Sequence, residues 1–448
     1  MSDDTKQAYA VSLGCPRNRV DTEKMLSALD SLGFESTLVP EDADLILVNT
    51  CAFLGSAVKE SIETILELAE NKKHKCKALV VTGCFPARYK NELLKRELPE
   101  VDLFLDPSQE DMLAELVRLK SRELSPKRDV SRKTGRMLTT PAGSAYLRVS
   151  DGCNRQCSFC IIPKLRGMQK SRPIEEILLE AKDLVSKGVV EINLVAQDLS
   201  AYGRDLQGGR TCLADLLVEL DKVKGLEWIR CMYLYPSGID DQLIDVISKM
   251  SRIAPYLDVP IQHVSSTVLK AMKRGYGYNR VESLIKKLRH RLPRFNLRTT
   301  VMVGHPGETG KDFEELLSFI QRVRFEHLGA FRFSPEQEAS AFFLEGRPTA
   351  GESYNRWRRI MAVQRKIARS KQRSYIGREV DVLITGQADE STMLNTGRHS
   401  GQAPDVDGRV YVRLWEESPN QLEVGRIYRV KIEKAMDYDL LGVALEGR

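Results

Sequence analysis

The stretch AYLRVSDGCNRQCSFCIIPKLRG, residues 145–167, carries three cysteines in the pattern C-x-x-x-C-x-x-C, at Cys153, Cys157 and Cys160. Apolar alternation at 146–149 predicts a strand, so the cysteines follow its carboxyl end, where sites gather in parallel α/β folds. A 4Fe–4S cube normally takes four cysteine ligands, one for each iron. Three thiolates in one loop therefore predict a cube with one iron left open to a ligand that is not protein.

A structural zinc site is the alternative interpretation of these cysteines. Such a site is a closed tetrahedron of four Cys or His ligands. The nearest other cysteines in the sequence are Cys84 and Cys212, and no histidine lies close by. We therefore favour the iron–sulfur cluster over zinc.

The composition is that of an ordinary globular protein, with 42% hydrophobic and 29% charged residues among 448. This length suggests about three domains.

No apolar stretch approaches the roughly 20 residues that cross a bilayer, and the start MSDDTKQAYAV lacks a secretory pattern. Nine cysteines without such a signal favour metal binding in a reducing compartment. We therefore expect a cytoplasmic protein with no membrane contact; the net charge of +6 identifies no partner by itself.

A second set of cysteines recurs in residues 8–106, where an apolar strand, a cysteine and a helix follow one another three times. Alternating strands and helices imply a parallel sheet, which would place all three cysteines at one edge, close enough to share a metal. The alternative is that these three cysteines are only small hydrophobic side chains of the core. A core cysteine, however, belongs within a strand or a helix face, whereas these three follow the ends of strands. We therefore favour a second iron–sulfur cluster. The predicted strands at 9–13, 45–48 and 78–81 lead to Cys15, Cys51 and Cys84, and a fourth strand follows at 103–105.

Six βα units are predicted between residues 145 and 333. They form an open, partial (β/α)6 barrel rather than a closed eightfold one, with active-site residues on the loops after the strands. Those loops contain the polar runs Gln197-Asp198, Gln262-His263 and GHPGE at 304–308; we interpret His263 as a buried core histidine rather than a catalytic one. The strands are predicted at 145–149, 190–195, 228–233, 256–261, 297–303 and 328–333.

Two basic segments flank this barrel. Residues 120–144 are rich in turn formers and predict a linker. Residues 354–375 predict a strongly basic helix, which we interpret as a solvated connecting helix; contact with RNA or another polyanion is the alternative.

The tail, residues 378–448, alternates apolar and polar residues in short runs at 380–384, 410–414, 428–432 and 441–445. This pattern, punctuated by Gly and Pro, is typical of a small all-β barrel. The tail has nine Lys and Arg but thirteen Asp and Glu, a net charge of −4. An acidic module repels phosphate and attracts a basic protein. We therefore expect tail carboxylates to recognise a basic protein, among them Asp405, Asp407, Asp437 and Asp439.

With the aromatic Phe159 before its last cysteine, the triplet at 153–160 resembles that of the radical S-adenosylmethionine superfamily. The resemblance implies that the open iron chelates S-adenosylmethionine and that an electron from the cluster cleaves it to a 5′-deoxyadenosyl radical. The Gln-Asp run and the GHPGE turn resemble the methylthiotransferase branch of that superfamily. They imply that Phe159, Gln197, Asp198 and Glu308 help to hold S-adenosylmethionine.

The resemblance also implies an α/β protein with a defined order of domains. It consists of a flavodoxin-like cluster-binding domain at 1–119, the linker at 120–144, a radical SAM domain with its connecting helix at 145–376, and a TRAM-like β-barrel at 377–448. The implied cofactors are S-adenosylmethionine and two 4Fe–4S clusters, one on each cysteine set.

Three segments resemble the RimO type of methylthiotransferase: SLGCPRNRVDTE at 12–23, APDVDGRVYV at 403–412 and AMDYDLLG at 435–442. This implies insertion of a methylthio group at the β-carbon of an aspartate in a small-subunit ribosomal protein. His305 and EQEAS at 336–340 depart from the usual pattern of the family. The alternatives are the same chemistry on a transfer-RNA adenosine, the MiaB type, and a non-catalytic electron-transfer protein. The implied further partners of a monomeric enzyme are a sulfur donor and a low-potential electron donor.

Overall fold

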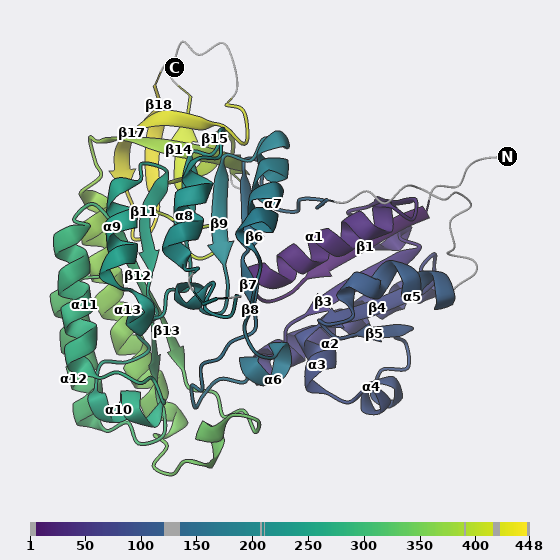
Figure 1. The fold of residues 1–448 in the computed structure, drawn as a ribbon, viewed down its shortest axis with the longest axis horizontal. Coiled ribbons are helices and arrows are strands. Elements are labelled where there is room, and N and C mark those ends of the chain that lie inside the picture. Colours follow the sequence, from purple (N-terminus) through teal and green to yellow (C-terminus); the bar gives the residue numbers. More distant parts are fainter. Residues whose placement is uncertain are drawn as a thin grey trace. The chain divides into compact units, whose positions relative to one another are not determined.

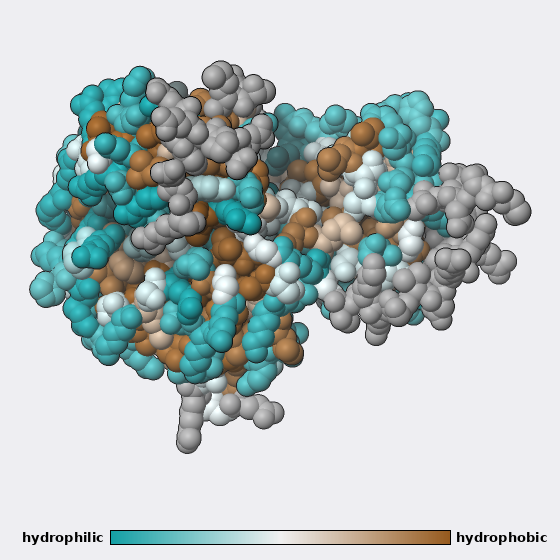
Figure 2. Space-filling view, turned by 90° about the horizontal axis from the view of Figure 1, so that it is seen from above, coloured by the Kyte–Doolittle hydropathy of each residue, from teal (hydrophilic) through white to brown (hydrophobic). Residues whose placement is uncertain are grey.

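The computed structural model describes residues 6–120, 135–206, 208–209, 211–388, 391–414 and 422–445. These fall into two compact units. The first contains the described residues of 1–139 together with 152–154 and 160–168, and the second contains 140–151, 155–159 and the described residues from 169 onward. Among the described helices, none combines the length and the apolar character that a bilayer span requires. Hydrophilic residues cover much of the visible face, and hydrophobic ones reach it in patches (Figure 2).

The first unit is built on a five-stranded sheet in the order β2-β1-β3-β4-β5, with every neighbouring pair parallel. This is the flavodoxin-like order, so the predicted fold class of this part is confirmed. β3 and β4 are buried along their whole length, as expected of central strands covered on both faces. The strands are β1 (Lys6–Ser12), β2 (Phe34–Ser36), β3 (Leu45–Thr50), β4 (Ala78–Gly83) and β5 (Leu103–Leu105).

Helices cover this sheet (Figure 1). Met25 and Leu29 of α1 and Leu113 and Val117 of α5 join the strands in one hydrophobic cluster. The three-residue strand β2 was missed from the sequence because it contains a single apolar residue, Phe34. The helices of this unit are α1 (Pro16–Asp30), α2 (Gly55–Ala69), α3 (Cys84–Arg88), α4 (Asn91–Glu97), α5 (Leu113–Lys120) and α6 (Ile162–Arg166).

Part of the predicted linker is an ordered segment of this unit. Arg136 is buried and pairs with the buried carboxylate of Glu23 on α1. The N–H and the hydroxyl of Thr139 both donate to Glu23, each at 2.9 Å. Residues 136–139 of the predicted linker are thus held against α1, whereas residues 121–134 lie outside the described residues.

The second unit begins with a six-stranded sheet in the order β13-β12-β11-β10-β9-β6, whose neighbours are all parallel. Its helices lie outside the strands (Figure 1), which confirms the partial (β/α)6 barrel. The fourth strand ends at Asp258 instead of 261, because Gln262 adopts a positive φ of 66° and makes only an isolated bridge to Val301. The strands are β6 (Ser144–Arg148), β9 (Glu191–Val195), β10 (Trp228–Cys231), β11 (Ile253–Asp258), β12 (Asn296–Val303) and β13 (His327–Arg332).

The barrel helices lie where the sequence has capping residues and apolar residues at helical spacing. α12 starts with a capping box between Thr309 and Asp312 and buries Phe313, Leu316 and Ile320 along one face. The basic connecting helix is α13, which begins earlier than predicted at a second capping box, Thr349 with Glu352. The helices are α7 (Ile174–Ser186), α8 (Leu213–Asp221), α9 (Asp241–Lys249), α10 (Ser266–Ala271), α11 (Tyr278–Arg291), α12 (Gly310–Val323) and α13 (Ala350–Arg373).

The tail forms a closed barrel in the order β14-β15-β16-β18-β17, so the predicted small all-β barrel is confirmed. The strand β15 was missed because its buried positions include polar residues such as Asn395 and Thr396. The strands are β14 (Glu379–Ala388), β15 (Ser391–His399), β16 (Val410–Arg413), β17 (Ile427–Ala435) and β18 (Leu440–Ala444).

A buried ion cluster joins this tail to the sheet of the same unit. Glu191 of β9 pairs with Arg230 of β10 at 2.8 Å and with Arg398 of β15 at 2.5 Å, and all three side chains are at most 8% exposed. Burial raises the pKa of the Glu191 carboxyl, but the guanidinium of Arg398, and then that of Arg230, hold it well below its usual range. The carboxylate is therefore charged at neutral pH, and the stabilisation is lost only in strong acid.

Replacing Arg398 with Met should lower the free energy of unfolding by about 3–5 kcal/mol, because a buried carboxylate loses one of its two cations. Thermal and denaturant unfolding of the full chain measure the loss. Arg426→Met is the matched control, since Arg426 pairs with Glu423 where both side chains are at least 60% exposed. That change should stay within about 1 kcal/mol. Equal effects of the two variants would contradict the role of the cluster.

Candidate functional site

The three cysteines of the first unit follow neighbouring strands at one edge of its sheet. Cys15 is the residue before α1, Cys51 follows the last residue of β3, and Cys84 is the first residue of α3. β1 and β3 form the point where the strand order reverses, which is where ligands bind in sheets of this order. The pKa of Cys51 is raised to about 11 by burial and then by Cys84 and Cys15, which lie within electrostatic range. The structure thus brings together the cysteines that the sequence singled out.

Gly14 lets Cys15 and Cys51 approach each other closely. Its φ is +86°, and a Cβ at this position would lie 2.6 Å from the Cβ of Cys51. The predicted cluster loop therefore requires glycine here.

Asn18 of α1 ties the ends of β1 and β3 together. It is fully buried, and its Nδ2 donates to the carbonyl oxygens of Leu13 and Thr50, both at 2.9 Å. Its Oδ1 accepts from Arg166 Nη2 at 2.6 Å, and Arg166 Nη1 lies 3.0 Å from Asp21. Arg166 stands on α6, six residues after Cys160 in the sequence, so α6 is anchored to the cysteine edge of the sheet.

Positive charge surrounds this first set of thiols. Arg17 Nη2 lies 3.7 Å from Cys15 Sγ. Burial raises the pKa of Cys15, but Arg17, the Asn18 backbone and Arg166 together lower it below its ordinary value. Within the described residues, no three His, Cys, Asp or Glu side chains could hold a single metal ion. Cluster ligation by Cys15, Cys51 and Cys84 therefore stays a prediction, which rests on three thiols at one edge of the sheet beside arginines.

The loop that carries the second set is closed by a short antiparallel pair, β7 (Ser150–Asp151) with β8 (Lys170–Ser171). Cys153 is buried, and its N–H donates to the Gly167 carbonyl at 3.1 Å. Cys160 Sγ accepts from the N–H of Ile162 at 3.5 Å. Cys157, described within the second unit, accepts from Arg274 Nη1 at 3.3 Å. Such donors stabilise a thiolate.

Arg274 was not singled out from the sequence, because nothing near it in the chain indicates a site. It is buried, its Nη2 donates to the Pro260 carbonyl at 2.8 Å, and its Nε donates to the Tyr276 hydroxyl at 2.8 Å. Its guanidinium also lies over the ring of Tyr235 at 4.1 Å. These contacts fix the cation beside Cys157.

Gln197 and Asp198 lie together after β9, but they have different surroundings. Both carboxylate oxygens of Asp198 already accept hydrogen bonds: Oδ2 accepts from Arg155 Nε at 2.8 Å and Oδ1 accepts from Ser200 at 2.6 Å. Gln197 Nε2 donates to Asp151 at 2.7 Å, while its buried Oε1 has no hydrogen-bond partner among the described residues. Gln197 thus offers an acceptor that a ligand amine would satisfy. Arg155, between the first two cysteines of the triplet, is a functional candidate that the motif itself could have indicated.

Glu308 is enclosed rather than open to a ligand. Its side chain is fully buried, its Oε2 accepts from the N–H of Gly304, and Arg356 Nη1 lies 3.2 Å from its Oε1. Burial raises the pKa of Glu308 to about 7 against the effect of Arg356. A role of Glu308 toward S-adenosylmethionine stays a prediction, and its position favours support of the turn at 304–308.

His263 lies beside this carboxylate, with its Nε2 4.0 Å from Glu308 Oε1. Its Nδ1 accepts from the N–H of Ser265 at 3.0 Å, which places the proton of the neutral ring on Nε2. Burial lowers the pKa of His263 to about 3, so the ring is neutral. Its burial fits the interpretation as a core histidine, but its Nε2 has no hydrogen-bond partner among the described residues.

Phe159 is half-buried in the cluster loop. Its neighbour Ser158 donates from its N–H to the Met272 carbonyl at 3.1 Å, and the Ser158 carbonyl accepts from Ala341 at 2.7 Å. The loop is thus held from two sides, and the contact of Phe159 with S-adenosylmethionine stays a prediction.

The acidic residues of the tail are less available to a partner than the sequence suggested. Each of the four carboxylates singled out has a partner within the chain, and their recognition of a basic protein stays a prediction. The tail acids at 389, 390, 416, 417 and 446 lie outside the described residues. The contacts are Asp405 with the Tyr146 hydroxyl at 2.8 Å, Asp407 with the Tyr256 hydroxyl at 2.7 Å, Asp437 with Arg369 at 2.6 Å and Asp439 with the Arg409 N–H at 2.7 Å.

Comparison with known proteins places these sites in a family. The model of the Radical SAM superfamily matches residues 147–320, that of the uncharacterized protein family UPF0004 matches 7–106, and that of the TRAM domain matches 376–445. Among solved structures, the radical S-adenosylmethionine methyltransferase TsrM from Kitasatospora setae covers 75% of this chain and 74% of its own, with a TM-score of 0.55. At 15% identity, this likeness concerns the fold alone.

Curated relatives match nearly the whole chain. A protein from Sorangium cellulosum named ribosomal protein uS12 methylthiotransferase RimO is 42% identical, over 99% of this chain and 91% of its own length. A protein of the same name from Myxococcus xanthus is 45% identical, over 98% of this chain and 92% of its own length. The chain therefore belongs to the RimO family of radical S-adenosylmethionine methylthiotransferases.

Proposed function

We propose that this protein inserts a methylthio group at the β-carbon of an aspartate in the small-subunit ribosomal protein uS12. The observation that carries the proposal is identity of 42–45% to proteins named for this activity, over 98–99% of the chain. The MiaB-type alternative is not favoured, because the full-length relatives described above carry the RimO name. Two sets of three cysteines, each beside fixed arginines, argue against a protein that only transfers electrons.

The described residues support two 4Fe–4S clusters and S-adenosylmethionine as cofactors. Cys15, Cys51 and Cys84 would hold one cluster, and Cys153, Cys157 and Cys160 the other. When bound, these groups supply the electron, the radical that removes hydrogen from an unactivated carbon, and the sulfur anchor. No side chain of the chain is basic enough to take a proton from such a carbon.

The surrounding residues position these groups. Arg17 and Arg166 offset the negative charge of the first set of thiolates, and Arg274 does so at Cys157. Gln197 Oε1 would accept from the amino group of S-adenosylmethionine, with Arg155 and Asp198 holding the loop beneath it. These roles, and the contacts of Phe159 and Glu308, are part of the proposal.

Expression of the chain in cells that lack their own uS12 methylthiotransferase tests the function. Mass spectrometry should show uS12 heavier by one methylthio group in place of hydrogen, with transfer-RNA digests unchanged. Methylthiolated adenosine with unmodified uS12 would overturn the proposal in favour of the MiaB type. A sulfur donor and a low-potential electron donor complete the proposed partners.

Charge reversal on the outer face of β14 tests whether the acidic tail meets a basic substrate. Glu379 and Asp381 are 51% and 55% exposed and pair only at the surface, with Arg429, so the double change to Lys should not unfold the tail. We expect the KM for uS12 to rise about threefold at low salt and to approach that of the parent protein at high salt. Steady-state rates of uS12 modification at low and at high salt measure this KM.

The control for that double variant is Glu63→Lys on α2, an acid that is 65% exposed and pairs with Lys59. Its KM should not change. A gain in transfer-RNA modification by the tail variant, with uS12 kinetics intact, would contradict recognition of a basic protein.

A further inference from the structure

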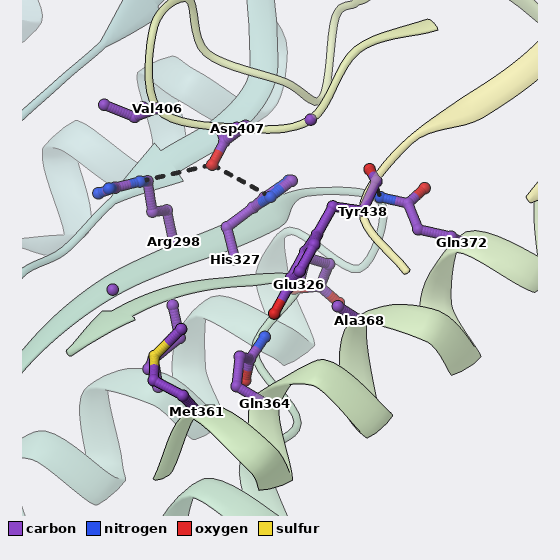
Figure 3. Close-up of a pocket in the computed structure, with 13 residues that line it drawn as sticks. Arg298, Glu326, His327, Met361, Gln364, Ala368, Gln372, Val406, Asp407 and Tyr438 are labelled. Atoms are coloured by element: carbon purple, nitrogen blue, oxygen red, sulfur yellow. Dashed lines mark hydrogen bonds and ion pairs between the residues drawn. The ribbon is translucent and has the colours of Figure 1, made fainter. Parts of the chain in front are cut away.

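Arg274 differs from other arginines in the interior of the second unit, which are balanced by carboxylates. Arg230 is fully buried and pairs with Glu191 at 2.8 Å. Arg298 lines a pocket of about 440 Å³ between β13, α13 and the tail, where Asp407 lies 3.5 Å from it (Figure 3). Arg274 is 6% exposed, and no Asp or Glu in the described part of the chain forms an ion pair with it.

The guanidinium of Arg274 donates to neutral oxygen atoms and to one sulfur. Its Nη2 donates to the Pro260 carbonyl and its Nε to the Tyr276 hydroxyl, both at 2.8 Å, whereas its Nη1 donates to Cys157 Sγ at 3.3 Å. Burial raises the pKa of Tyr276 and that of Tyr235, whose ring lies 4.1 Å from the guanidinium, so both phenols are uncharged. Cys157 is therefore the contact of Arg274 that can carry a balancing negative charge.

The backbone holds Arg274 in this place. α10 ends in a turn in which Lys273 has a positive φ of 54°. The N–H groups of Lys273 and Arg274 each donate to a carbonyl oxygen of α10 at 3.0 Å, the pattern of a Schellman motif. The carbonyl of Met272 accepts from the N–H of Ser158 at 3.1 Å, so the same turn also bonds to the residue after Cys157. The cation is thus fixed beside the sulfur by main-chain hydrogen bonds on both sides of the contact.

A buried cation is costly unless an anion balances it. A cysteine that binds a metal centre does so as a thiolate, so a cluster on Cys153, Cys157 and Cys160 would supply the anion that Arg274 lacks. The reduction potential of an iron–sulfur cluster depends on its net charge and on hydrogen bonds to its sulfur atoms. One added electron is one more negative charge, and a fixed cation beside a ligand sulfur stabilises that state more than the oxidised one. Such a cation therefore raises the potential.

We propose that Arg274 is the counter-cation of the cluster on the triplet at 153–160 and that it sets the reduction potential of this cluster. The inference rests on the proposed function, because both need a cluster at this position that takes one electron from the low-potential donor. Arg155, which lies within the triplet, does not have this role, since Asp198 already balances its charge at 2.8 Å.

A redox titration of the reconstituted full-length protein tests the proposal. Electron paramagnetic resonance should follow the cluster whose signal changes when S-adenosylmethionine is added, which identifies the cluster on this triplet. Arg274→Gln removes the charge but keeps amide donors. It should raise the ratio of oxidised to reduced cluster at a fixed potential about tenfold, which is 59 mV for one electron. Arg274→Lys, which keeps the charge, should retain most of the parent potential.

Lys273→Gly is the matched control, because it removes an exposed cation of the same turn and glycine adopts the positive φ without strain. Its cluster should keep the parent potential. Equal potentials of the parent protein and Arg274→Gln would overturn the proposal. An equal fall in Lys273→Gly would also overturn it, because overall charge rather than the contact with Cys157 would then set the potential.

Iron analysis decides the matter if Arg274→Gln does not hold this cluster. Iron retained by Arg274→Lys would show that the site needs a cation, whereas loss of iron from both variants would overturn the proposal, because the requirement would then be for the shape of arginine. The potentials are measured without uS12. Failure of the parent protein to modify uS12 would therefore overturn the proposed function separately from this inference.

Discussion

Replacing Cys153, Cys157 and Cys160 together with Ala should leave the anaerobically reconstituted protein with about half of its iron and abolish formation of 5′-deoxyadenosine. The intact protein should hold about eight irons, as two cubes of four. The loop between β7 and β8 supplies the three thiolates, and Arg274 can stabilise one of them only while Cys157 is present. Iron analysis and chromatography of the cleavage products measure both effects.

Cys212→Ala is the control for the loss of a cysteine as such. Cys212 precedes α8 and bonds to Asp215, away from both sets in the sequence. The Cys212→Ala variant should keep the full iron content and the full rate of S-adenosylmethionine cleavage. A triple variant that still cleaved S-adenosylmethionine would show that the site assignment is wrong.

The cysteine edge of the first sheet followed from local patterns. LILVNT and ALVVTG each begin with four apolar residues and have the length of buried strands, and each is followed directly by a cysteine. Parallel strands separated by helices leave only one edge for those cysteines. This part of the site could therefore be predicted before any contact was known.

The side chains that support the cysteines could not be predicted, because their partners are distant in the sequence. Asn18 joins the ends of β1 and β3, and Arg166 reaches Asn18 across 148 positions of the chain. Arg274 and Cys157 are 117 positions apart. No periodicity or spacing indicates such pairs, and only the folded chain brings them together.

The tail shows what a charge count cannot predict, namely which of its acids are paired within the chain. Its net charge of −4 is a property of the sequence. Asp407 nevertheless lies against Arg298 and His327, and Asp405 accepts from Tyr146, so these acids join the tail to the barrel. Composition reports how many charges a module has, whereas pairing decides which of them a partner can meet.

Replacing Cys15, Cys51 and Cys84 with Ala should separate the two halves of the chemistry. Formation of 5′-deoxyadenosine should continue, because the triplet at 153–160 is intact, while methylthio transfer to uS12 should vanish for want of a sulfur anchor. The iron content should again fall to about half. Product analysis and the spectrum of the remaining cluster measure the separation.

The contacts of α6 make this a demanding test. Arg166, six residues after Cys160, bonds to Asn18 at the edge that carries Cys15 and Cys51, so damage to this edge could reach the other triplet through α6. Asn18→Ala is the matched variant, because it removes one of the two contacts that hold Arg166, the other being with Asp21, and spares all six cysteines. If the triple variant lost the spectrum of the remaining cluster while Asn18→Ala kept both clusters, the first cysteine set would be a structural requirement of the second. Retention of that spectrum together with loss of transfer would assign the sulfur anchor to Cys15, Cys51 and Cys84.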